Sequence, residues 1–248
     1  MKTLYIDVET SPNLAYVWRL WDQNISLNQV VEQTEILCFA HMWGTSKRAA
    51  TCDIWNDGRR AMAAKLHELL NEADLVVGYN SRSFDVKLIN SLMVEEGFGP
   101  PSPYAQFDLY VEAKKAFKWP TMKLQNVLER LGLENKLSTG GFELWKGCLE
   151  GDWDCIGKML AYNKQDVEIM PALLERLRPW SRSYPNRSLF VDTENPVCPR
   201  CGSTHVGPRG QYTSGTGTYR KYFCKECKSW SRSPKLSKDS RRAGLRSV

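Results

Sequence analysis

The alternation of apolar and polar positions predicts two kinds of element along the chain. Near the N-terminus, runs rich in β-branched and aromatic residues are separated by polar turns. These runs predict strands over 2–8, 14–21, 36–44 and 50–55. Because polar turns join them, we expect an antiparallel meander. A later apolar run over 74–80 predicts a short buried strand that enters a loop.

From residue 59 onward the apolar residues recur at helical spacing. They predict helices over 59–73, 84–96 and 107–117, and a further helix that is capped by Thr121 and stopped by Gly132. The last helix should begin at Asp152 as its N-cap and run to Leu177, with a kink or a restart at Pro171. The pattern leaves 133–151 as either a lid or a packed connector.

The order of these elements predicts an α/β domain over 1–177. Residues 178–196 are expected to be a linker, 197–233 a small second module, and 234–248 a basic tail that is disordered. No internal repeat is found. The 248 residues are enough for one medium domain and one small one.

Charge is distributed unevenly between the two regions. The segment 178–248 carries 15 Lys/Arg and 4 Asp/Glu, a net charge of +11, whereas the whole chain carries +6. A basic C-terminal region on a mildly acidic body (net −5 over 1–177) favours a polyanionic partner. The alternative is a solvated tail without a partner.

No apolar run approaches the ~20 residues needed to span a bilayer, so a membrane partner is not expected. Acidic residues follow the first apolar run at once, which does not match a signal peptide. We therefore expect a protein that is cytoplasmic or otherwise intracellular, and not secreted. Protein partners and oligomeric state are not predicted.

The first candidate site is the acid pair at the end of the first predicted strand. Residues i and i+2 of a strand point to the same face, so Asp7 and Glu9 should lie side by side. Two neighbouring carboxylates repel each other unless a cation lies between them. The pair therefore indicates either a metal site or a strand that ends in solvent.

Two later segments carry further acids. Asp85 follows a buried strand and a polar loop, where it is either a ligand or a first-turn acid favoured by the helix dipole. Tyr162 and Asp166 are four residues apart and share one helix face, away from the apolar stripe. A second D-x-D pair, Asp152 and Asp154, follows no strand and is rejected as a metal pair.

Together these motifs resemble the DnaQ-like, ribonuclease H-like superfamily in its tyrosine-bearing DEDD branch. The resemblance covers roughly 1–177, and 142–167 looks most like the group related to proofreading domains of family B DNA polymerases. The histidine-bearing branch would need His where Ala161 stands, so the tyrosine branch fits. The resemblance implies a mixed sheet whose first three strands are antiparallel, flanked by helices.

The resemblance also implies a mechanism with two Mg²⁺ or Mn²⁺ ions. Asp7, Glu9 and Asp166 would hold one ion, while Asp7 would bridge to a second that Asp85 binds directly or through water. Tyr162, whose phenol is a poor base near neutral pH, would orient the attacking water. The expected reaction is 3′→5′ exonucleolytic hydrolysis of single-stranded nucleic acid, which releases 5′-mononucleotides. Thr10 and Ser11 would either contact the terminal nucleotide or only cap the strand exit.

The eight cysteines fall into two groups. Cys38, Cys52, Cys148 and Cys155 stand among apolar residues and should be buried thiols. Cys198, Cys201, Cys224 and Cys227 form two C-x-x-C pairs, which in a chain without an export signal indicate one tetrahedral structural Zn²⁺ in a zinc ribbon. Aromatic residues alternate with Lys and Arg around the second pair, so the ribbon is expected to bind nucleic acid; a protein partner is the alternative.

DNA is preferred over RNA as the substrate, by analogy with the polymerase-associated domains alone. An RNA-directed exonuclease and an endonuclease of the same fold remain alternatives. A non-catalytic nucleic-acid-binding protein is the rival from another class. The presence of all four acids and the tyrosine argues against it.

Overall fold

The computed structural model describes residues 1–133, 141–215 and 217–236. The chain divides into two compact units, of which one is Lys2–Leu174 and the other begins at Glu175. In the described part, none of the helices is both long and apolar enough to cross a membrane.

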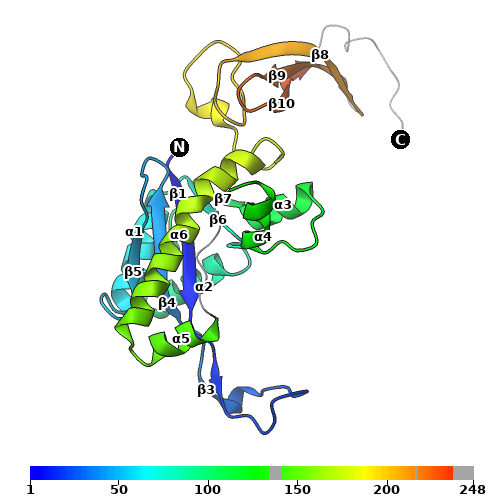
Figure 1. Ribbon diagram of the computed structural model, residues 1–248. Helices are drawn as coiled ribbons and strands as arrows, with labels where there is room; N and C mark the ends of the chain where they lie inside the picture. Colours follow the sequence, from blue (N-terminus) through cyan, green and yellow to red (C-terminus); the bar gives the residue numbers. More distant parts are fainter. Residues whose placement is uncertain (134–140, 216, 237–248) are drawn as a thin grey trace. The chain divides into compact units, whose positions relative to one another are not determined.

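The first unit is built on a mixed sheet with strand order β5-β4-β1-β6-β7 within the described residues (Figure 1). Its strands are β1 Thr3–Thr10, β4 Ile36–Trp43, β5 Ala50–Asp53, β6 Leu75–Gly78 and β7 Ala105–Asp108. β1, β4 and β5 are antiparallel, which confirms the expected direction of the first three strands of this sheet. β6 pairs in parallel with both β1 and β7.

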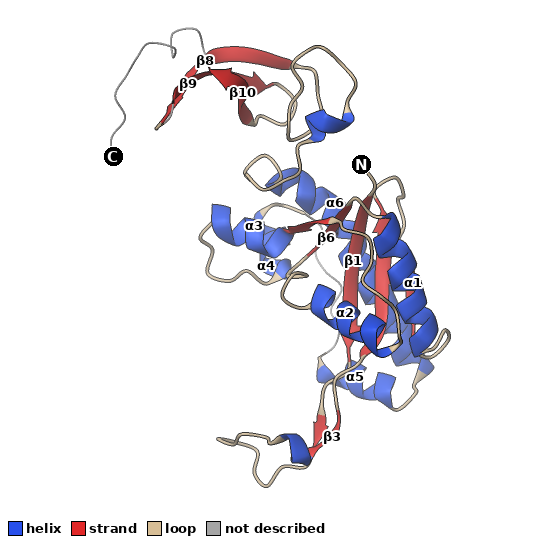
Figure 2. Cartoon of the chain, turned by 180° about the vertical axis from the view of Figure 1, so that it is seen from behind, coloured by secondary structure: helices blue, strands red, loops and turns tan. Residues whose placement is uncertain are grey.

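Helices cover both faces of this sheet, as the fold class predicted (Figures 1 and 2). The helices are α1 Arg59–Glu72, α2 Asp85–Glu95, α3 Leu109–Ala116, α4 Leu124–Arg130, α5 Phe142–Leu149 and α6 Trp153–Leu177. Leu4, Ile6 and Val8 of β1 pack in one core cluster with α1 and α2. Cys38 of β4 packs with α5 and α6 in another cluster. The alternating residues Tyr5, Asp7 and Glu9 therefore face the α6 side.

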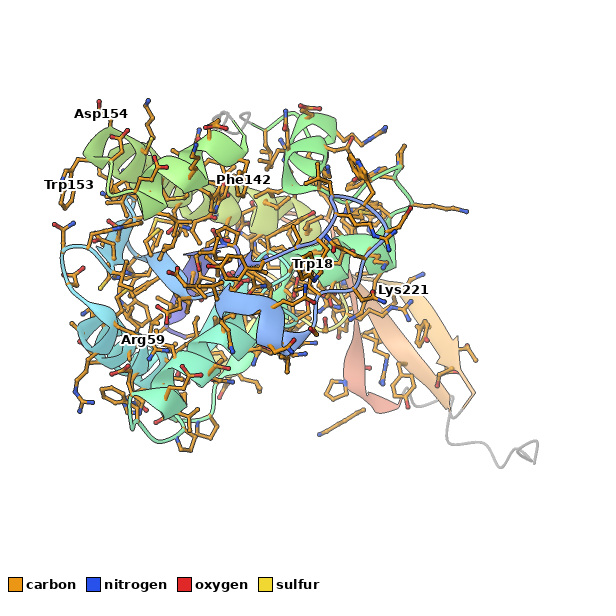
Figure 3. The ribbon with its side chains drawn as sticks, turned by 90° about the horizontal axis from the view of Figure 1, so that it is seen from below. Trp18, Arg59, Phe142, Trp153, Asp154 and Lys221 are labelled. Atoms are coloured by element: carbon orange, nitrogen blue, oxygen red, sulfur yellow. The ribbon has the colours of Figure 1, made fainter. Side chains whose placement is uncertain are left out.

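The predicted strand over 14–21 is wrong. Only Leu14–Ala15 (β2) is extended, and it pairs with β3, Val30–Glu32, in a separate two-stranded sheet. Both edges of β1 are already paired, with β4 and β6, so the main sheet has no place for this run beside β1. Residues 12–35, which include the one-turn η1 Leu27–Gln29, form an arm that carries Trp18 (Figure 3). The Trp18 side chain is 95% exposed.

Several predicted boundaries also differ. The helix expected over 107–117 begins at Leu109, because Ala105–Asp108 form a strand that sequence reasoning missed and Asp108 caps the helix. Thr121 is not an N-cap: α4 begins at Leu124 after Lys123, although Gly132 with φ +65° follows its end as expected. The unassigned region contains α5, while 134–140 lie outside the described residues.

The helix predicted from Asp152 is α6, and it continues through Pro171 without a restart. Asp152 Oδ1 accepts the N–H groups of Asp154 and Cys155 at 2.8 and 3.4 Å, which confirms its capping role. Asp154 is exposed at the outer end of the helix (Figure 3), so this D-x-D pair has the structural role that was expected.

The second unit contains a three-stranded antiparallel sheet within its described residues, in the order β10-β9-β8. Its strands are β8 Val206–Ser214, β9 Gly217–Cys224 and β10 Trp230–Leu236. The predicted linker contains the short helix η2 Arg187–Phe190 and the buried Tyr184. The tail was predicted from 234, but β10 continues to Leu236; the expected disorder of 237–248 lies outside the described residues.

Candidate active site

The acid pair of β1 meets the third acid of α6 as the motif order predicted. Asp7, Glu9 and Asp166 each offer a carboxylate oxygen, and these oxygens lie within 4.8 Å of one another. Asp166 is 3% exposed, while the other two are half-buried. Three carboxylates at this separation repel one another strongly, because part of their surroundings is protein rather than water. A divalent cation would remove that repulsion.

The chemistry of this donor set fits a hard cation. Mg²⁺ and Mn²⁺ prefer carboxylate oxygens and retain several waters, so a few protein ligands are enough. Cys38 stands opposite Glu9 in the pairing of β4 with β1, and its thiol suits a hard cation less well than the carboxylates do. Burial, with a further contribution from Glu9, raises the pKa of Cys38 far above its usual value and keeps it protonated.

Asn163 joins this cluster, and sequence reasoning missed it. It is fully buried on α6, and its Nδ2 donates to Asp7 Oδ2 at 2.8 Å and to the Asp7 carbonyl oxygen at 3.3 Å. A buried polar side chain is costly unless it is hydrogen-bonded. The sequence signal was its spacing of four residues from Met159 and Val167, which indicates a buried position but does not reveal Asp7 as the partner.

Asp85 lies beside the acid pair but outside the cluster of three carboxylates. It is the first residue of α2, is 3% exposed, and its Oδ1 accepts the backbone N–H of Val8 at 3.0 Å. The pairing of β6 with β1 ends at Tyr5, so the edge of β1 at Val8 extends beyond β6. Burial raises the pKa of Asp85 to about 6, even though the Val8 N–H opposes this shift.

Asp108 holds the loop that leads to Asp85, and this role was also missed. Its carboxylate accepts the N–H groups of Asn80 and Arg82, each at 3.0 Å, and that of Val111 at 3.2 Å. Asn80 has φ +63°, a conformation that Asn tolerates better than most residues. One buried carboxylate at the end of β7 therefore fixes both this loop and the start of α3.

Thr10 and Ser11 lie at the exit of β1, where both take part in structural hydrogen bonds. The Thr10 carbonyl accepts the indole N–H of Trp145 at 3.1 Å. The Ser11 hydroxyl accepts the Glu35 N–H at 2.9 Å, and the Ser11 N–H donates to the Glu35 carbonyl at 2.9 Å. These bonds fasten the base of the arm, and contact with a nucleotide stays a prediction for both residues.

Tyr162 is half-buried on α6 and lies one turn before Asp166, on the same side of the helix. It is therefore held next to the carboxylate cluster by the helix itself. Its role towards water stays a prediction.

Cys198, Cys201, Cys224 and Cys227 form the second group of possible ligands, with sulfur atoms within 4.8 Å of one another. None of these four cysteines forms a disulfide. Two equivalent turns hold them: the N–H of Gly202 donates to the Cys198 carbonyl at 2.9 Å, and the N–H of Lys228 donates to the Cys224 carbonyl at 3.1 Å. Gly202 and Lys228 both have positive φ, +79° and +59°.

The environment of Cys198 favours a thiolate. Burial opposes ionisation, but hydrogen bonds from the Ser229 hydroxyl and from backbone N–H groups lower its pKa to about 7. Burial raises the pKa values of Cys201 and Cys224, so zinc would have to displace their protons when it binds. The four sulfur atoms lie close enough together for a closed tetrahedral site. Of the other cysteines, three are buried as predicted, whereas Cys155 is only half-buried.

A protein-family model described as RNase_H superfamily matches residues 4–178. The chain belongs to this superfamily. The match covers all of the five-stranded sheet except Thr3 and includes all four acids, so the ribonuclease H-like fold predicted from the motifs is confirmed. A search of curated proteins found no match.

Solved structures similar to this superfamily member include three of interest. They are the family B DNA polymerase of Pyrobaculum calidifontis (17% identity, TM-score 0.49), exonuclease I in complex with SSB-Ct (13%, 0.46) and the Nibbler EXO domain of Aedes aegypti (12%, 0.47). The matches cover 72%, 90% and 71% of this chain, in the same order. They cover 25%, 52% and 77% of the polymerase, exonuclease I and Nibbler chains. At these identities and TM-scores the likenesses do not establish a shared activity.

Proposed function

We propose that this chain is a metal-dependent 3′→5′ exonuclease that hydrolyses terminal phosphodiesters of single-stranded nucleic acid. The observation that carries the proposal is the convergence of Asp7, Glu9 and Asp166 within 4.8 Å in a domain of the ribonuclease H superfamily. Asp85 adds a fourth carboxylate, which is buried next to β1. Such a cluster is costly to stability, which argues that it is maintained for chemistry.

In this proposal Asp7, Glu9 and Asp166 hold one Mg²⁺ or Mn²⁺, and Asp7 with Asp85 holds a second. When bound, such ions supply charge neutralisation for the phosphodiester and an activated water. Asn163 fixes the orientation of the Asp7 carboxylate. Tyr162 orients the attacking water by hydrogen bonding, and Thr10 and Ser11 contact the terminal nucleotide. Removing one of these positioning groups should therefore lower the rate more than the affinity.

The four-cysteine cluster is proposed to hold one structural Zn²⁺ in a zinc ribbon that helps to bind the substrate. A closed Cys₄ site leaves no open coordination position for catalysis. Because the unit that carries it is small, the metal would supply much of its folding free energy. DNA is the preferred substrate and RNA the alternative, and an intracellular location remains a prediction.

The test is hydrolysis of matched DNA and RNA oligonucleotides, labelled at the 5′ end, with Mn²⁺ either added or omitted. Chelators are avoided because they would also remove zinc. We expect a ladder of shortened products that requires Mn²⁺ and disappears in Asp7→Asn. Asp154→Asn, which removes an exposed carboxylate elsewhere on the domain, is the matched control and should retain activity.

A blocked 3′ end distinguishes the rival activities. It should stop an exonuclease, whereas an endonuclease would cut internally. Intact substrate with a mobility shift in every condition would show a binding protein and would overturn the enzymatic proposal.

A further inference from the structure

One face of the β8–β9–β10 sheet carries aromatic and cationic side chains together. Tyr219, Lys221 and Phe223 alternate along β9 and so share a face. The strand register places Tyr212 opposite Tyr219, Arg232 opposite Lys221 and Trp230 opposite Phe223. Residues directly opposite in an antiparallel pair point to the same side. We call this the stacking face; its members are Tyr212, Tyr219, Lys221, Phe223, Trp230 and Arg232.

Contacts between these side chains fix the rings and the charges relative to one another. Arg232 Cζ lies 3.9 Å from the centroid of the Tyr219 ring, and Lys221 Nζ lies 4.9 Å from that of Trp230. Arg209 Cζ lies 5.9 Å from the Phe223 centroid and adds a third cation at the edge of the stacking face. Cation–π contacts of this kind hold a charge close to a ring without neutralising it.

The rings of the stacking face are not simply the core of a small unit. Trp230 is 52% exposed and Tyr212 47% exposed, although both are large apolar groups. The opposite face has a different environment. There, Tyr222, Ser231 and Ser233 line a hollow of about 870 Å³ together with residues before and after Cys198, and Arg232 of the stacking face also contributes to this lining. The two faces of the sheet therefore differ: one exposes aromatic rings, and the other lines a hollow.

The chemistry of the stacking face selects one class of ligand. Its members and Arg209 include three cations and no carboxylate, in a region whose net charge is +11 over 178–248. Phosphates would meet these cations, and planar bases would cover the exposed rings. In a duplex the faces of the bases are already stacked, so exposed rings favour a single strand.

We propose that the stacking face binds single-stranded nucleic acid, with bases on Trp230 and Tyr212 and phosphates at Arg209, Lys221 and Arg232. The inference deepens the proposed function, in which this unit helps to hold the substrate. It concerns binding by the second unit alone, so it can fail while the carboxylate cluster remains active, and the reverse also holds.

The test measures binding separately from catalysis. Full-length chain carrying Asp7→Asn is titrated into a fluorescent oligothymidylate of about 20 nucleotides, and anisotropy is followed without added Mg²⁺ or Mn²⁺. Trp230→Ala should weaken binding about 5- to 150-fold, the range for loss of one stacked base. Trp230→Phe should recover most of the loss because it restores a ring.

Charge variants on the two sides of the sheet form the matched pair. Arg232→Ala should weaken binding and reduce the slope of log K against log salt by about 0.7, the value for one phosphate contact on a single strand. Arg220→Ala removes the same charge from an exposed position on the other face of β9 and should change affinity less than Arg232→Ala does. Zinc content and circular dichroism verify that each variant is folded.

Three outcomes would overturn the proposal. The first is unchanged affinity in folded Trp230→Ala and Arg232→Ala. The second is equal affinity for a duplex of the same length. The third is competition by polyglutamate as effective as competition by unlabelled oligothymidylate, which would indicate an acidic protein as the partner.

Discussion

Replacing Asp85 by Asn should stabilise the metal-free protein while abolishing its activity. The wild-type carboxyl group is buried, and this burial raises its pKa from 3.8 to about 6, with Asp108 adding to the shift. The folded state therefore binds more protons than the unfolded state between these two values. Stability falls as pH rises through this interval, and above pH 6 the full cost of burying the charge is present.

The magnitude follows from the shift. One pKa unit corresponds to about 1.36 kcal/mol, so a change from 3.8 to about 6 corresponds to about 3 kcal/mol. Asn does not ionise, yet its side-chain oxygen can still accept the Val8 N–H. Asp85→Asn should thus be at most about 3 kcal/mol more stable than wild type near neutral pH. At about pH 5 the gain should be about half as large.

The assay is denaturant-induced unfolding followed by far-UV circular dichroism, without divalent metal, at about pH 7.5 and about pH 5. This signal reports mainly on Lys2–Leu174, which contains α1 to α5 and most of α6. Asp154→Asn controls for the loss of one negative charge. Added Mn²⁺ should stabilise the wild type more than Asp85→Asn, because the variant retains only the ion site formed by Asp7, Glu9 and Asp166.

A gain in stability that does not depend on pH would refute the argument from burial. So would a variant that is less stable than the wild type at both pH values. Retention of Mn²⁺-dependent turnover in Asp85→Asn would instead remove this residue from the proposed metal site.

Three further predictions concern other parts of the structure. Gly78→Ala should destabilise the protein by about 1–3 kcal/mol in chemical denaturation, because its Cβ atom would lie 2.5 Å from the Ser81 side chain. Gly157→Ala, which adds a methyl group in open space on α6, should stabilise the protein by about 0.5–1 kcal/mol. Asn163→Ala should lower turnover at saturating Mn²⁺ about 10- to 100-fold, because Asp7 loses the group that orients it, and unchanged turnover would contradict this. Cys198→Ser should abolish zinc binding, measured by metal analysis, and weaken oligonucleotide binding; retention of one zinc per chain would show that this residue is not a ligand.

The carboxylate cluster could be predicted from sequence because its geometry is local at each position. A period of two fixes Asp7 and Glu9 on one face of a strand, and a spacing of four fixes Tyr162 next to Asp166 on a helix. Only the contact between β1 and α6 joins residues that are far apart in sequence. It was predicted because the order of the motifs resembles that of a known fold. Asp85 was placed by the same order.

The supporting residues were harder to predict, because their partners lie far away in sequence. Asn163 bonds Asp7 across 156 positions, and Asp108 bonds Asn80 across 28. Neither residue type is unusual in a helix or at a strand end. Their roles depend on which distant groups they meet in the folded chain, and a local window does not report that.

The arm shows a different limit of pattern reasoning. Residues 14–21 contain many large apolar side chains. Such a pattern indicates how much free energy the segment would gain if these side chains were buried. Whether the chain itself provides that burial depends on how many strand edges remain open. β4 pairs along one edge of β1, while β6 and then the Asp85 carboxylate bond the other, so the run does not join the sheet there, and Trp18 and Trp21 remain 95% and 80% exposed. The number of open edges is a property of the whole topology, so a correct local preference led to an incorrect strand.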